Sequence, residues 1–234
     1  MEDFKGFHVE YSGRLSNNGF YIRVEVDDPL ISLRTIFMSL IDISWINHFF
    51  PKYDWVHNSV LSRVMPTIER IRKSFDNGDN PTINRDTGEK MVSEISRKTL
   101  VDDFNFWAMP IAELFKQKVD GNPGFDFHTV LLKRELLMFG EAKYAKDKTP
   151  YKDAMGQISD FIDEKKDMKD LLEISLFMPS EKTLENADNG FKGYIAAFST
   201  NGKSDEYIID KVINHKEYNK LSQYPLFIAI AVNL

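Results

Sequence analysis

Two apolar runs on either side of a short charged segment form the clearest pattern along the chain. The runs cover residues 125–132 and 135–144, and Lys133 and Arg134 lie between them. Short runs rich in Val, Leu, Phe and Met that flank a polar pair predict two antiparallel strands and their turn. Lys-Arg is not a favoured pair for a two-residue turn, so the pattern favours a loop of four residues.

The length of that loop decides which side chains share a face of the hairpin. With a loop of two or four residues centred on Lys-Arg, Asp126 lies directly opposite Glu141. Period-two alternation then adds His128 and Lys143 to the same face. The other face carries the residues that we expect in the core: Phe125, Phe127, Thr129, Leu131, Leu136, Met138, Gly140 and Ala142. A three-residue loop would instead place the two acids on opposite faces.

Paired carboxylates on neighbouring strands predict a cation site. Two carboxylates directly across a ladder repel each other, and a bound cation relieves that repulsion. Oxygen-only ligands favour Mg²⁺ or Mn²⁺. The alternative is an amphipathic hairpin whose charges form a solvated face. Apolar residues on both faces argue against it, because such strands lie inside a sheet covered by helices, where buried charges need partners. For His128 we expect a packed or hydrogen-bonded side chain.

Before the hairpin, the pattern predicts mainly helices. An Asn-Gly turn at residues 18–19 predicts a first hairpin over residues 7–27. Residues 29–50 are interpreted as a buried helix or as a helix plus a strand, and residues 76–90 as an exposed linker. Further helices are predicted over residues 59–75 and over residues 93–119, the second interrupted at Pro110.

After the hairpin, helices and strands alternate. Thr149 and Pro150 are typical of a helix start, and this helix is expected to end near residue 166. Strands are predicted over residues 172–178, 193–198 and 226–232, and the last is so apolar that we expect it at the centre of the sheet. A helix is predicted over residues 205–220.

Length and composition limit the class of protein. A chain of 234 residues with 42% apolar residues can form one α/β domain, or a core with an N-terminal elaboration. The sequence has no cysteine, which excludes disulfides, thiolate metal sites and cysteine nucleophiles, and which is typical of cytoplasmic proteins. We find no apolar run near 18 residues and no charged-then-apolar leader, so we expect no membrane span.

The acids and the lysine of the hairpin resemble the signature of the PD-(D/E)XK nuclease superfamily. That signature is an acid, a gap of hairpin length, and an acid-x-Lys on the adjacent strand. Here it is Asp126 followed by Glu141-Ala142-Lys143, with Gly124-Phe125 where the superfamily usually has a proline. Four other acid-x-Lys matches occur in this chain, but none of them follows an apolar strand run: Asp3-Phe4-Lys5, Asp163-Glu164-Lys165, Glu164-Lys165-Lys166 and Asp167-Met168-Lys169.

The resemblance implies a fold and a division of the chain. The fold is an α/β, restriction-endonuclease-like mixed β-sheet flanked by helices, with an N-terminal α+β elaboration. Residues 1–90 would form the elaboration, a hairpin plus helices, and residues 91–234 the nuclease core.

The resemblance also implies a Mg²⁺-dependent deoxyribonuclease and assigns its site. Metal ligands would be the carboxylates of Asp126 and Glu141 and the carbonyl of Ala142. Lys143 would stabilise charge on the phosphate or position the attacking water. Two assignments concern the flanking helices, because members of the superfamily often carry an additional acid before the first catalytic strand and a polar residue after the second. These are Glu113 and Gln157, and for each of them a solvated helix face is the alternative.

Residues 95–234 resemble one group within the superfamily, the nuclease subunits of the Hachiman anti-phage defence system. The likeness rests on G-x-D-x-H, then G-E-A-K-Y and a short C-terminal strand. It implies a cytoplasmic bacterial DNA endonuclease that works with a helicase-like protein subunit.

Charge leaves a second interpretation open. The net charge of −6 is unfavourable for DNA binding, although residues 133–152 hold six basic residues and three acids. A partner that grips the DNA would resolve this. The alternatives are a catalytically inactive nuclease-fold subunit with an interaction or regulatory role and, less favoured, a small-molecule or nucleotide hydrolase. No phosphate-binding loop, dinucleotide fingerprint, His-Glu-x-x-His motif or nucleophile elbow is present.

Overall fold

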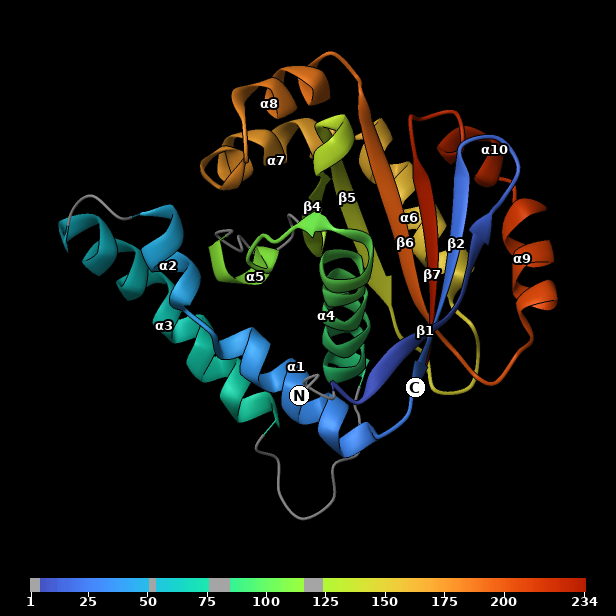
Figure 1. Cartoon of the computed structure of the whole chain (residues 1–234), viewed down its shortest axis with the longest axis horizontal. Helices are drawn as coiled ribbons and strands as arrows, with labels where there is room; N and C mark the ends of the chain where they lie inside the picture. Colours follow the sequence, from blue (N-terminus) through green and yellow to red (C-terminus); the bar gives the residue numbers. More distant parts are fainter. Residues whose placement is uncertain (1–4, 51–53, 76–84, 116–123) are drawn as a thin grey trace.

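A seven-stranded mixed sheet forms the centre of the molecule. The computed structural model describes residues 5–50, 54–75, 85–115 and 124–234. The strand order is β1-β2-β7-β6-β5-β4-β3, and the sheet is strongly curled and flanked by helices (Figure 1). The chain is therefore an α/β protein.

The four central strands are parallel, so their carboxyl ends lie at one edge of the sheet. These strands are β2 (Gly19–Val26), β7 (Phe227–Asn233), β6 (Lys192–Thr200) and β5 (Leu136–Lys143). Three antiparallel strands flank them: β1 (Phe7–Arg14) beside β2, then β4 (Phe127–Leu131) and β3 (Phe106–Trp107) beside β5. Because β1 and β2 belong to this sheet, the first hairpin packs with the rest of the chain. The domain boundary at residues 90 and 91 stays a prediction.

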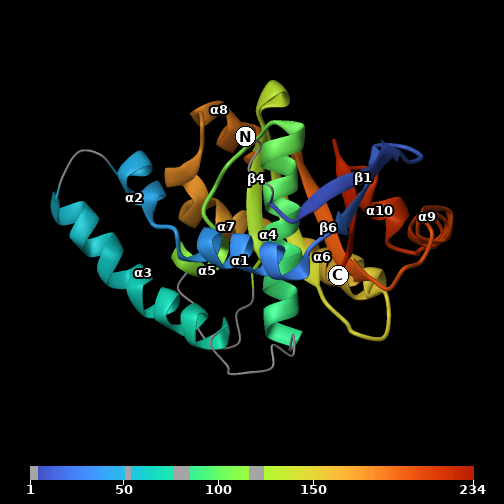
Figure 2. The same ribbon diagram turned by 60° about the horizontal axis from the view of Figure 1, so that its bottom comes forward.

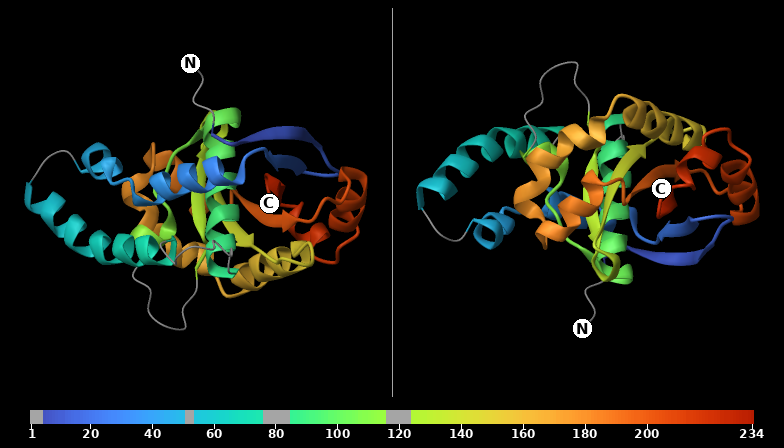
Figure 3. Two further views of the ribbon diagram at one scale, coloured as in Figure 1. Left: turned by 90° about the horizontal axis from the view of Figure 1, so that it is seen from below. Right: turned by 90° about the horizontal axis from the view of Figure 1, so that it is seen from above.

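Helices cover both faces of the sheet, and each face has its own apolar cluster. On the first face lie α1 (Pro29–Ile41), α3 (Asp54–Phe75) and α4 (Arg85–Phe104). On the second lie α6 (Tyr151–Asp163), α7 (Lys166–Ile174), α8 (Glu181–Asp188), α9 (Asp205–Ile213) and α10 (Tyr218–Leu221). Figure 2 shows α1 crossing α4, and Figure 3 shows the α2–α3 arm and α9 at opposite ends of the molecule.

The central hairpin has the predicted register. β4 and β5 pair Leu131 with Leu136 and Phe127 with Gly140, which leaves a four-residue loop between them. A short 3-10 turn, Leu132–Arg134, fills that loop, and Glu135 closes it with a φ of 47°. β5 is buried along almost its whole length, as expected for a strand that is covered on both faces.

Several other predicted elements are confirmed. The first hairpin turns at Asn17, whose φ is 56°, and β7 lies between β2 and β6 at the centre of the sheet. The helix predicted after the central hairpin is α6, although its N-cap is Pro150 and no side chain caps it. The stretch 29–50 is two helices, because α1 ends at Ile41 and α2 (Ser44–Phe49) starts after Asp42.

Four predicted elements are wrong in type or extent. The helix predicted over residues 93–119 with an interruption at Pro110 ends at Phe104, and the strand β3 lies between it and Pro110. Residues 172–178 are not a strand but the end of α7 and a 3-10 turn, Ser175–Phe177; Leu172 and Leu176 of that apolar run are exposed, so the run has no strand face. The predicted linker 76–90 falls partly outside the described residues, and its remainder from Arg85 is helical. The helix 205–220 is two helices, α9 and α10, and α8 was not predicted.

One helical stretch is long and apolar enough to be a candidate membrane span, although none was expected from the sequence. By length and composition alone, Pro29–Phe49 could cross a membrane. In the structure it bends at Asp42, whose carboxylate accepts hydrogen bonds from the backbone and hydroxyl of Ser44. Core helices of soluble proteins, which are mostly buried, and signal sequences pass the same test, and 22% of this stretch is buried.

A glycine brings α4 close to the carboxyl end of β5. A Cβ at Gly88 would lie 2.3 Å from the ring of Tyr144, the residue after β5. Only a hydrogen at this position allows the ring to lie against the helix. This contact places the first turns of α4 beside the end of the central strand.

We predict opposite effects for alanine at two helical glycines. Gly88→Ala should lower the free energy of unfolding by about 1–3 kcal/mol, because the added methyl overpacks the contact with Tyr144. Gly156→Ala, in α6, meets no atom within 4 Å and should raise it by about 0.5–1 kcal/mol through helix propensity. Urea unfolding of both variants measures this, and equal stabilisation would contradict the close packing at Gly88.

Candidate functional site

Asp126 and Glu141 lie near each other where the central hairpin opens, and the charge of Asp126 acts on Glu141. Asp126 precedes β4 by one residue, and its backbone N–H donates to the carbonyl of Gly140 at 2.9 Å. The regular ladder runs from Leu131 and Leu136 to Phe127 and Gly140, which confirms the loop of even length. The direct pairing of Asp126 with Glu141 lies beyond that ladder and stays a prediction.

Glu141 and Lys143 belong to the sheet face that α6 covers. In the neighbouring strand β6 they pair with Ala196 and Phe198, and both of these residues lie in the apolar cluster beneath α6. Paired residues of parallel strands point to the same face. Phe125 was expected on the other face with Phe127, but it lies in this cluster, 5.2 Å from Phe139 between ring centroids. The reason is that residue 125 precedes the regular pleat of β4.

Two hydrogen bonds order the three hairpin residues of the site, Asp126, Glu141 and Lys143, and one of them comes from the backbone of Ala142. The Lys143 ammonium donates to Oε1 of Glu141 at 2.5 Å, and the backbone N–H of Ala142 donates to Oδ2 of Asp126 at 2.8 Å. Glu141 is 1% exposed, and the side chain of Lys143 is 12% exposed. Glu141 is thus almost free of water, and Asp126 and Lys143 beside it are half-buried.

This environment changes the proton affinity of the site. Burial, followed by the charge of Asp126, raises the pKa of Glu141 well above its usual range, and Lys143 offsets this only in part. For Lys143, burial lowers the pKa, but the attraction of Glu141 and Asp126 is stronger, and the pKa is raised on balance. Lys143 therefore keeps its proton. With both acids ionised, the three side chains carry a formal charge of −1.

The donor atoms of this cluster fit a hard divalent cation. Oε2 of Glu141 is buried and accepts no hydrogen bond from any described residue, which is costly for a carboxylate oxygen. Two neighbouring carboxyl groups are oxygen ligands of the kind that Mg²⁺ or Mn²⁺ prefers, and a bound cation would favour the ionised form of Glu141. Within the described ranges no group of three His, Asp or Glu residues is arranged for a metal, so two carboxylates make up the side-chain set.

Glu89 is an acid near this site that was not predicted from the sequence. Its charge raises the pKa of both Glu141 and Lys143. It belongs to the first turns of α4, which the contact between Gly88 and Tyr144 holds beside β5. Glu89 also pairs with Arg85 at 3.2 Å. Met91, Val92 and Ile95 have the spacing of a buried helix face. Extending this periodicity towards the N-terminus would have placed Glu89 in the same helix.

Glu113 and Gln157, the two residues assigned to the flanking helices, lie outside the hairpin, on the short helix α5 (Ala112–Phe115) and on α6. Glu113 pairs with Arg70 at 2.9 Å and with Lys90 at 4.0 Å, so it connects α5 to α3 and α4. Gln157 is half-buried on α6, which covers the correct face, yet in the described part of the chain no hydrogen bond joins it to the three hairpin residues. Metal or catalytic roles for both stay predictions.

His128 has the structural role that was expected. It is fully buried, and its Nε2 lies 3.1 Å from Oδ2 of Asp170 in α7. Its ring packs edge-on against Phe139 with centroids 5.4 Å apart. The histidine therefore connects the hairpin to α7.

Comparisons with protein-family models, with curated proteins and with solved structures found no match for this chain.

We predict that Glu141 makes stability depend on pH. Its pKa in the folded state lies above the unfolded value of about 4.5, so the folded state holds an extra proton between the two values. The free energy of unfolding should therefore fall as pH rises from about 4.5 through the folded pKa. Glu141→Gln should remove this fall and should exceed the wild type in stability at pH values above the folded pKa.

The control for this prediction is Glu185→Gln, which changes an exposed carboxylate of α8 and should keep the wild-type pH slope. Mg²⁺ should restore part of the stability that the wild type loses at high pH, because the cation stabilises the ionised carboxylate, and it should do little for Glu141→Gln. Identical pH slopes for the wild type and Glu141→Gln would show that Glu141 titrates normally.

Proposed function

We propose that the protein is a metal-dependent deoxyribonuclease that hydrolyses phosphodiester bonds in a bacterial anti-phage defence system, together with a helicase-like partner. The observation that carries this proposal is the clustering of Asp126, Glu141 and Lys143 beside the carboxyl end of β5, with Glu141 buried and the other two half-buried. Two acids that can hold a divalent cation and a lysine that stays protonated are suited to the hydrolysis of a phosphate ester.

The arrangement of elements around the hairpin supports a restriction-endonuclease-like interpretation of the sheet. A helix, two antiparallel strands, a second helix and a parallel strand occur in the order α4, β4, β5, α6 and β6, with β3 and α5 inserted before β4 and α7 and α8 inserted before β6. The helices α4 and α6 cover opposite faces of β5, the strand that carries Glu141 and Lys143.

Each residue of the site has a distinct task in the proposed mechanism. When bound, Mg²⁺ or Mn²⁺ supplies the Lewis acid for phosphate and water. Asp126 and Glu141 would hold the cation, with the Ala142 carbonyl as a further oxygen donor. The oxygen of a water molecule bonds to phosphorus as the bond from phosphorus to the leaving sugar oxygen breaks. That water gives one proton to the solvent, and the leaving sugar oxygen takes one proton from the solvent. The Lys143 ammonium stabilises the negative charge that accumulates on the phosphate oxygens.

A partner would explain how a chain with a net negative charge acts on DNA. The net charge is −6, and the basic residues after the hairpin, Lys146, Lys148 and Lys152, are few. Affinity for DNA comes largely from neutralised phosphates, so an acidic protein gains it by associating with a basic or DNA-tracking subunit. This supports a division of work in which the partner holds DNA and this chain cleaves it.

We predict that Lys143 and Glu141 separate catalysis from metal binding. Lys143→Ala should reduce Mg²⁺-dependent cleavage of supercoiled and linear DNA by about 10²–10³-fold, because it removes an electrostatic stabiliser, while Mg²⁺ affinity is retained. Glu141→Gln should lose both cleavage and Mg²⁺ binding. Cleavage assays with Mg²⁺ and with EDTA, in the presence of the partner, and calorimetric Mg²⁺ titration measure the two properties.

Matched variants sharpen that experiment. Lys182→Ala changes an exposed lysine on α8 and should leave both properties unchanged. Glu89→Gln should weaken Mg²⁺ binding more than Glu113→Gln, because the charge of Glu89 acts on Glu141, whereas Glu113 is paired with Arg70 and Lys90. Mg²⁺ binding without any cleavage by the wild type would favour the inactive interaction subunit, and wild-type cleavage by Lys143→Ala would contradict the mechanism.

We predict weak DNA binding by the isolated chain. Its affinity for duplex DNA at physiological salt should be no tighter than the ~10⁻⁶ M typical of non-specific binding, and its salt slope should be shallow. Adding the partner should increase both. Tight binding by the chain alone, with a steep slope in a salt titration, would show that no partner is required.

A further inference from the structure

The arm formed by α2 and α3 carries a row of exposed cations (Figure 1). Arg63, Arg70 and Lys73 are exposed on α3 and follow one another at spacings of seven and three residues. At 3.6 residues per turn, these spacings place the three side chains on one side of the helix. Another side of α3 packs into the apolar cluster of the first face. We call the three cations the α3 stripe. It is about 15 Å long at 1.5 Å per residue.

The stripe is largely free of neutralising acids. In the described part of the chain, Arg63 and Lys73 form no ion pair, and Arg70 pairs with Glu113. Over its whole length α3 has four arginines and lysines and only two acids, Asp54 and Glu69. A positive helix on a chain with a net charge of −6 is a local reversal of sign, and such a surface attracts anions.

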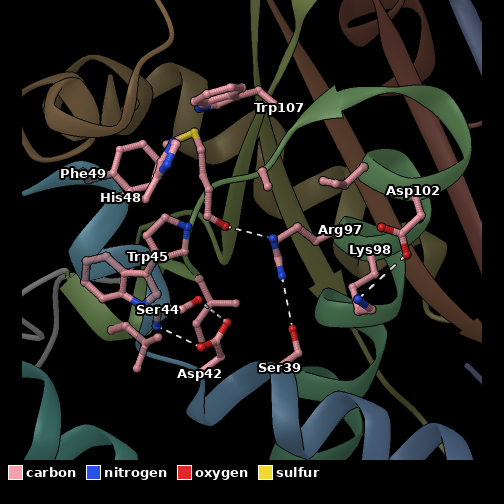
Figure 4. Close-up of a pocket in the computed structure, with 16 residues that line it drawn as sticks. Ser39, Asp42, Ser44, Trp45, His48, Phe49, Arg97, Lys98, Asp102 and Trp107 are labelled. Carbon is pink, nitrogen blue, oxygen red and sulfur yellow. Dashed lines mark hydrogen bonds and ion pairs between the residues drawn. The ribbon is translucent and has the colours of Figure 1, made fainter. Parts of the chain in front are cut away.

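The direction of the arm is fixed at its root. The carboxylate of Asp42, between α1 and α2, accepts hydrogen bonds from the backbone and the hydroxyl of Ser44, both at 2.8 Å. Arg97 of α4 donates to the hydroxyl of Ser39 at 3.4 Å and so holds the end of α1 (Figure 4). The helix α3 in turn packs against α1, α2 and α5. The stripe is therefore in place before an anion arrives, which lowers the entropic cost of binding.

The C-terminal end of the stripe reaches the border of the candidate site. Glu113 accepts from Arg70 at 2.9 Å and lies 4.0 Å from the ammonium of Lys90, in the first turns of α4. The residue before Lys90 is Glu89, whose charge acts on Glu141. One ion-pair network thus connects α3 to the part of α4 that borders the site.

A second group of cations lies on the other side of α4. Lys146, Lys148 and Lys152 are exposed after the end of β5, and Lys148 pairs with the exposed Asp153 at 2.8 Å. The carbonyl of Lys146 accepts from the side chain of Asn201 at 2.7 Å, which holds this segment at the end of β6. The helices α3 and α6 lie on opposite sides of α4 (Figure 2). Cations therefore flank the site from two directions.

An elongated polyanion fits this distribution of charge. The acids between the two groups, Glu89, Asp126 and Glu141, repel an anion when no cation is bound, so the favourable contacts lie at the flanks. A compact anion reaches only one flank. A DNA duplex contacts both, because its phosphates form a continuous row. At 3.4 Å per step of a strand, the α3 stripe faces about four phosphates.

We propose that the α3 stripe and the three lysines after β5 hold a DNA duplex across the candidate site through contacts to its phosphates. This inference rests on the proposed function for the class of substrate and adds the surface that orients it. A basic partner would supply most of the affinity, whereas these contacts align the duplex with the acids. Contacts to phosphates carry no sequence information, so this surface should not select a base sequence.

Salt-dependent binding of a labelled duplex tests the α3 stripe. The full chain is titrated by fluorescence anisotropy in EDTA, so that no metal-dependent cleavage takes place, between about 50 and 200 mM salt. Arg63→Gln combined with Lys73→Gln removes two charges and breaks no ion pair among the described residues. The slope of log affinity against log salt should become shallower by about 1.8, which is about 0.9 for each lost contact, and affinity at the lower salt should fall at least about tenfold. An unchanged slope would overturn the proposal.

The matched control is Arg14→Gln combined with Lys133→Gln. Both residues are exposed. Arg14 is paired with Phe20 at the start of β2, and Lys133 lies in the loop before β5, so both are at the opposite edge of the sheet from the site. This variant changes the net charge equally and should keep the wild-type slope. Thermal unfolding checks that both double variants are folded. Equal losses in the two variants would show that only total charge matters and would refute the stripe.

Lys146→Gln combined with Lys152→Gln tests whether the duplex extends across the site. If the same duplex contacts both flanks, this variant should also make the salt slope shallower by about 1.8. A wild-type slope in this variant would contradict a duplex that crosses the site.

Polyglutamate tests an acidic protein as the alternative occupant of this surface. Its charges along an extended strand are about 3.3 Å apart, roughly twice the spacing of about 1.7 Å along a duplex. A polyglutamate chain with as many charges as the duplex should therefore displace the label at least about tenfold less effectively than unlabelled duplex. Equal displacement would favour an acidic protein and reject DNA as the occupant.

Cleavage assays separate this inference from the proposed function. In Mg²⁺, Arg63→Gln combined with Lys73→Gln should raise the DNA concentration needed for half-maximal rate and leave the maximal rate unchanged, because neither residue touches the reacting atoms. Cleavage by the wild type with unchanged DNA affinity in this variant would retain the proposed function and reject the stripe. Stripe-dependent binding without any cleavage would retain the stripe and reject the proposed function.

Discussion

The burial of the Glu141 carboxylate beside Asp126 is the constraint around which the structure is built. A carboxylate that is almost free of water and faces a second acid is unfavourable on its own. The fold accepts it because Lys143 donates to one of its oxygens and because β5 is enclosed on both faces by α4 and α6. The other oxygen of Glu141 accepts nothing from the described residues, and this deficit identifies the place where a cation would be stabilised.

The parallel centre of the sheet concentrates polar groups at one edge. Four parallel strands end on the same side, and the hairpin adds the start of β4 to the end of β5 at that edge. Small contacts then decide which further groups reach it. Gly88 lets Tyr144 lie against α4, and this approach brings the charge of Glu89 to act on Glu141 and Lys143.

The helix α4 connects two regions with different chemistry. Its first turns place Glu89 where its charge acts on Glu141, and its second half holds the buried Glu94 and Arg97, which lines a pocket together with Trp45 and Trp107. A buried ion pair is costly unless its remaining polar groups are bonded, and Arg97 also donates to the Met109 carbonyl and to the Ser39 hydroxyl. Glu89 and Arg97 are about 12 Å apart along the helix axis.

The sequence by itself determined the elements whose signal is local. The register of β4 and β5 followed from a loop of even length around Lys133 and Arg134, and alternation within β5 then placed Glu141 and Lys143 on one face of the sheet. The central position of β7 followed from its apolar composition. In each case the spacing of neighbouring residues contains the whole argument, because a strand's side chains alternate with a period of two.

Contacts between distant segments were decided only by the tertiary structure. Residues 172–178 are apolar enough for a strand, but helical packing of α7 leaves Leu172 and Leu176 exposed. Glu89 reaches the site from a segment about fifty residues away in sequence, and the Arg97 pocket combines α1, α2 and α4. Sequence periodicity describes which face of an element is apolar. It does not contain the distance between two elements, which depends on how side chains such as Tyr144 fit against Gly88.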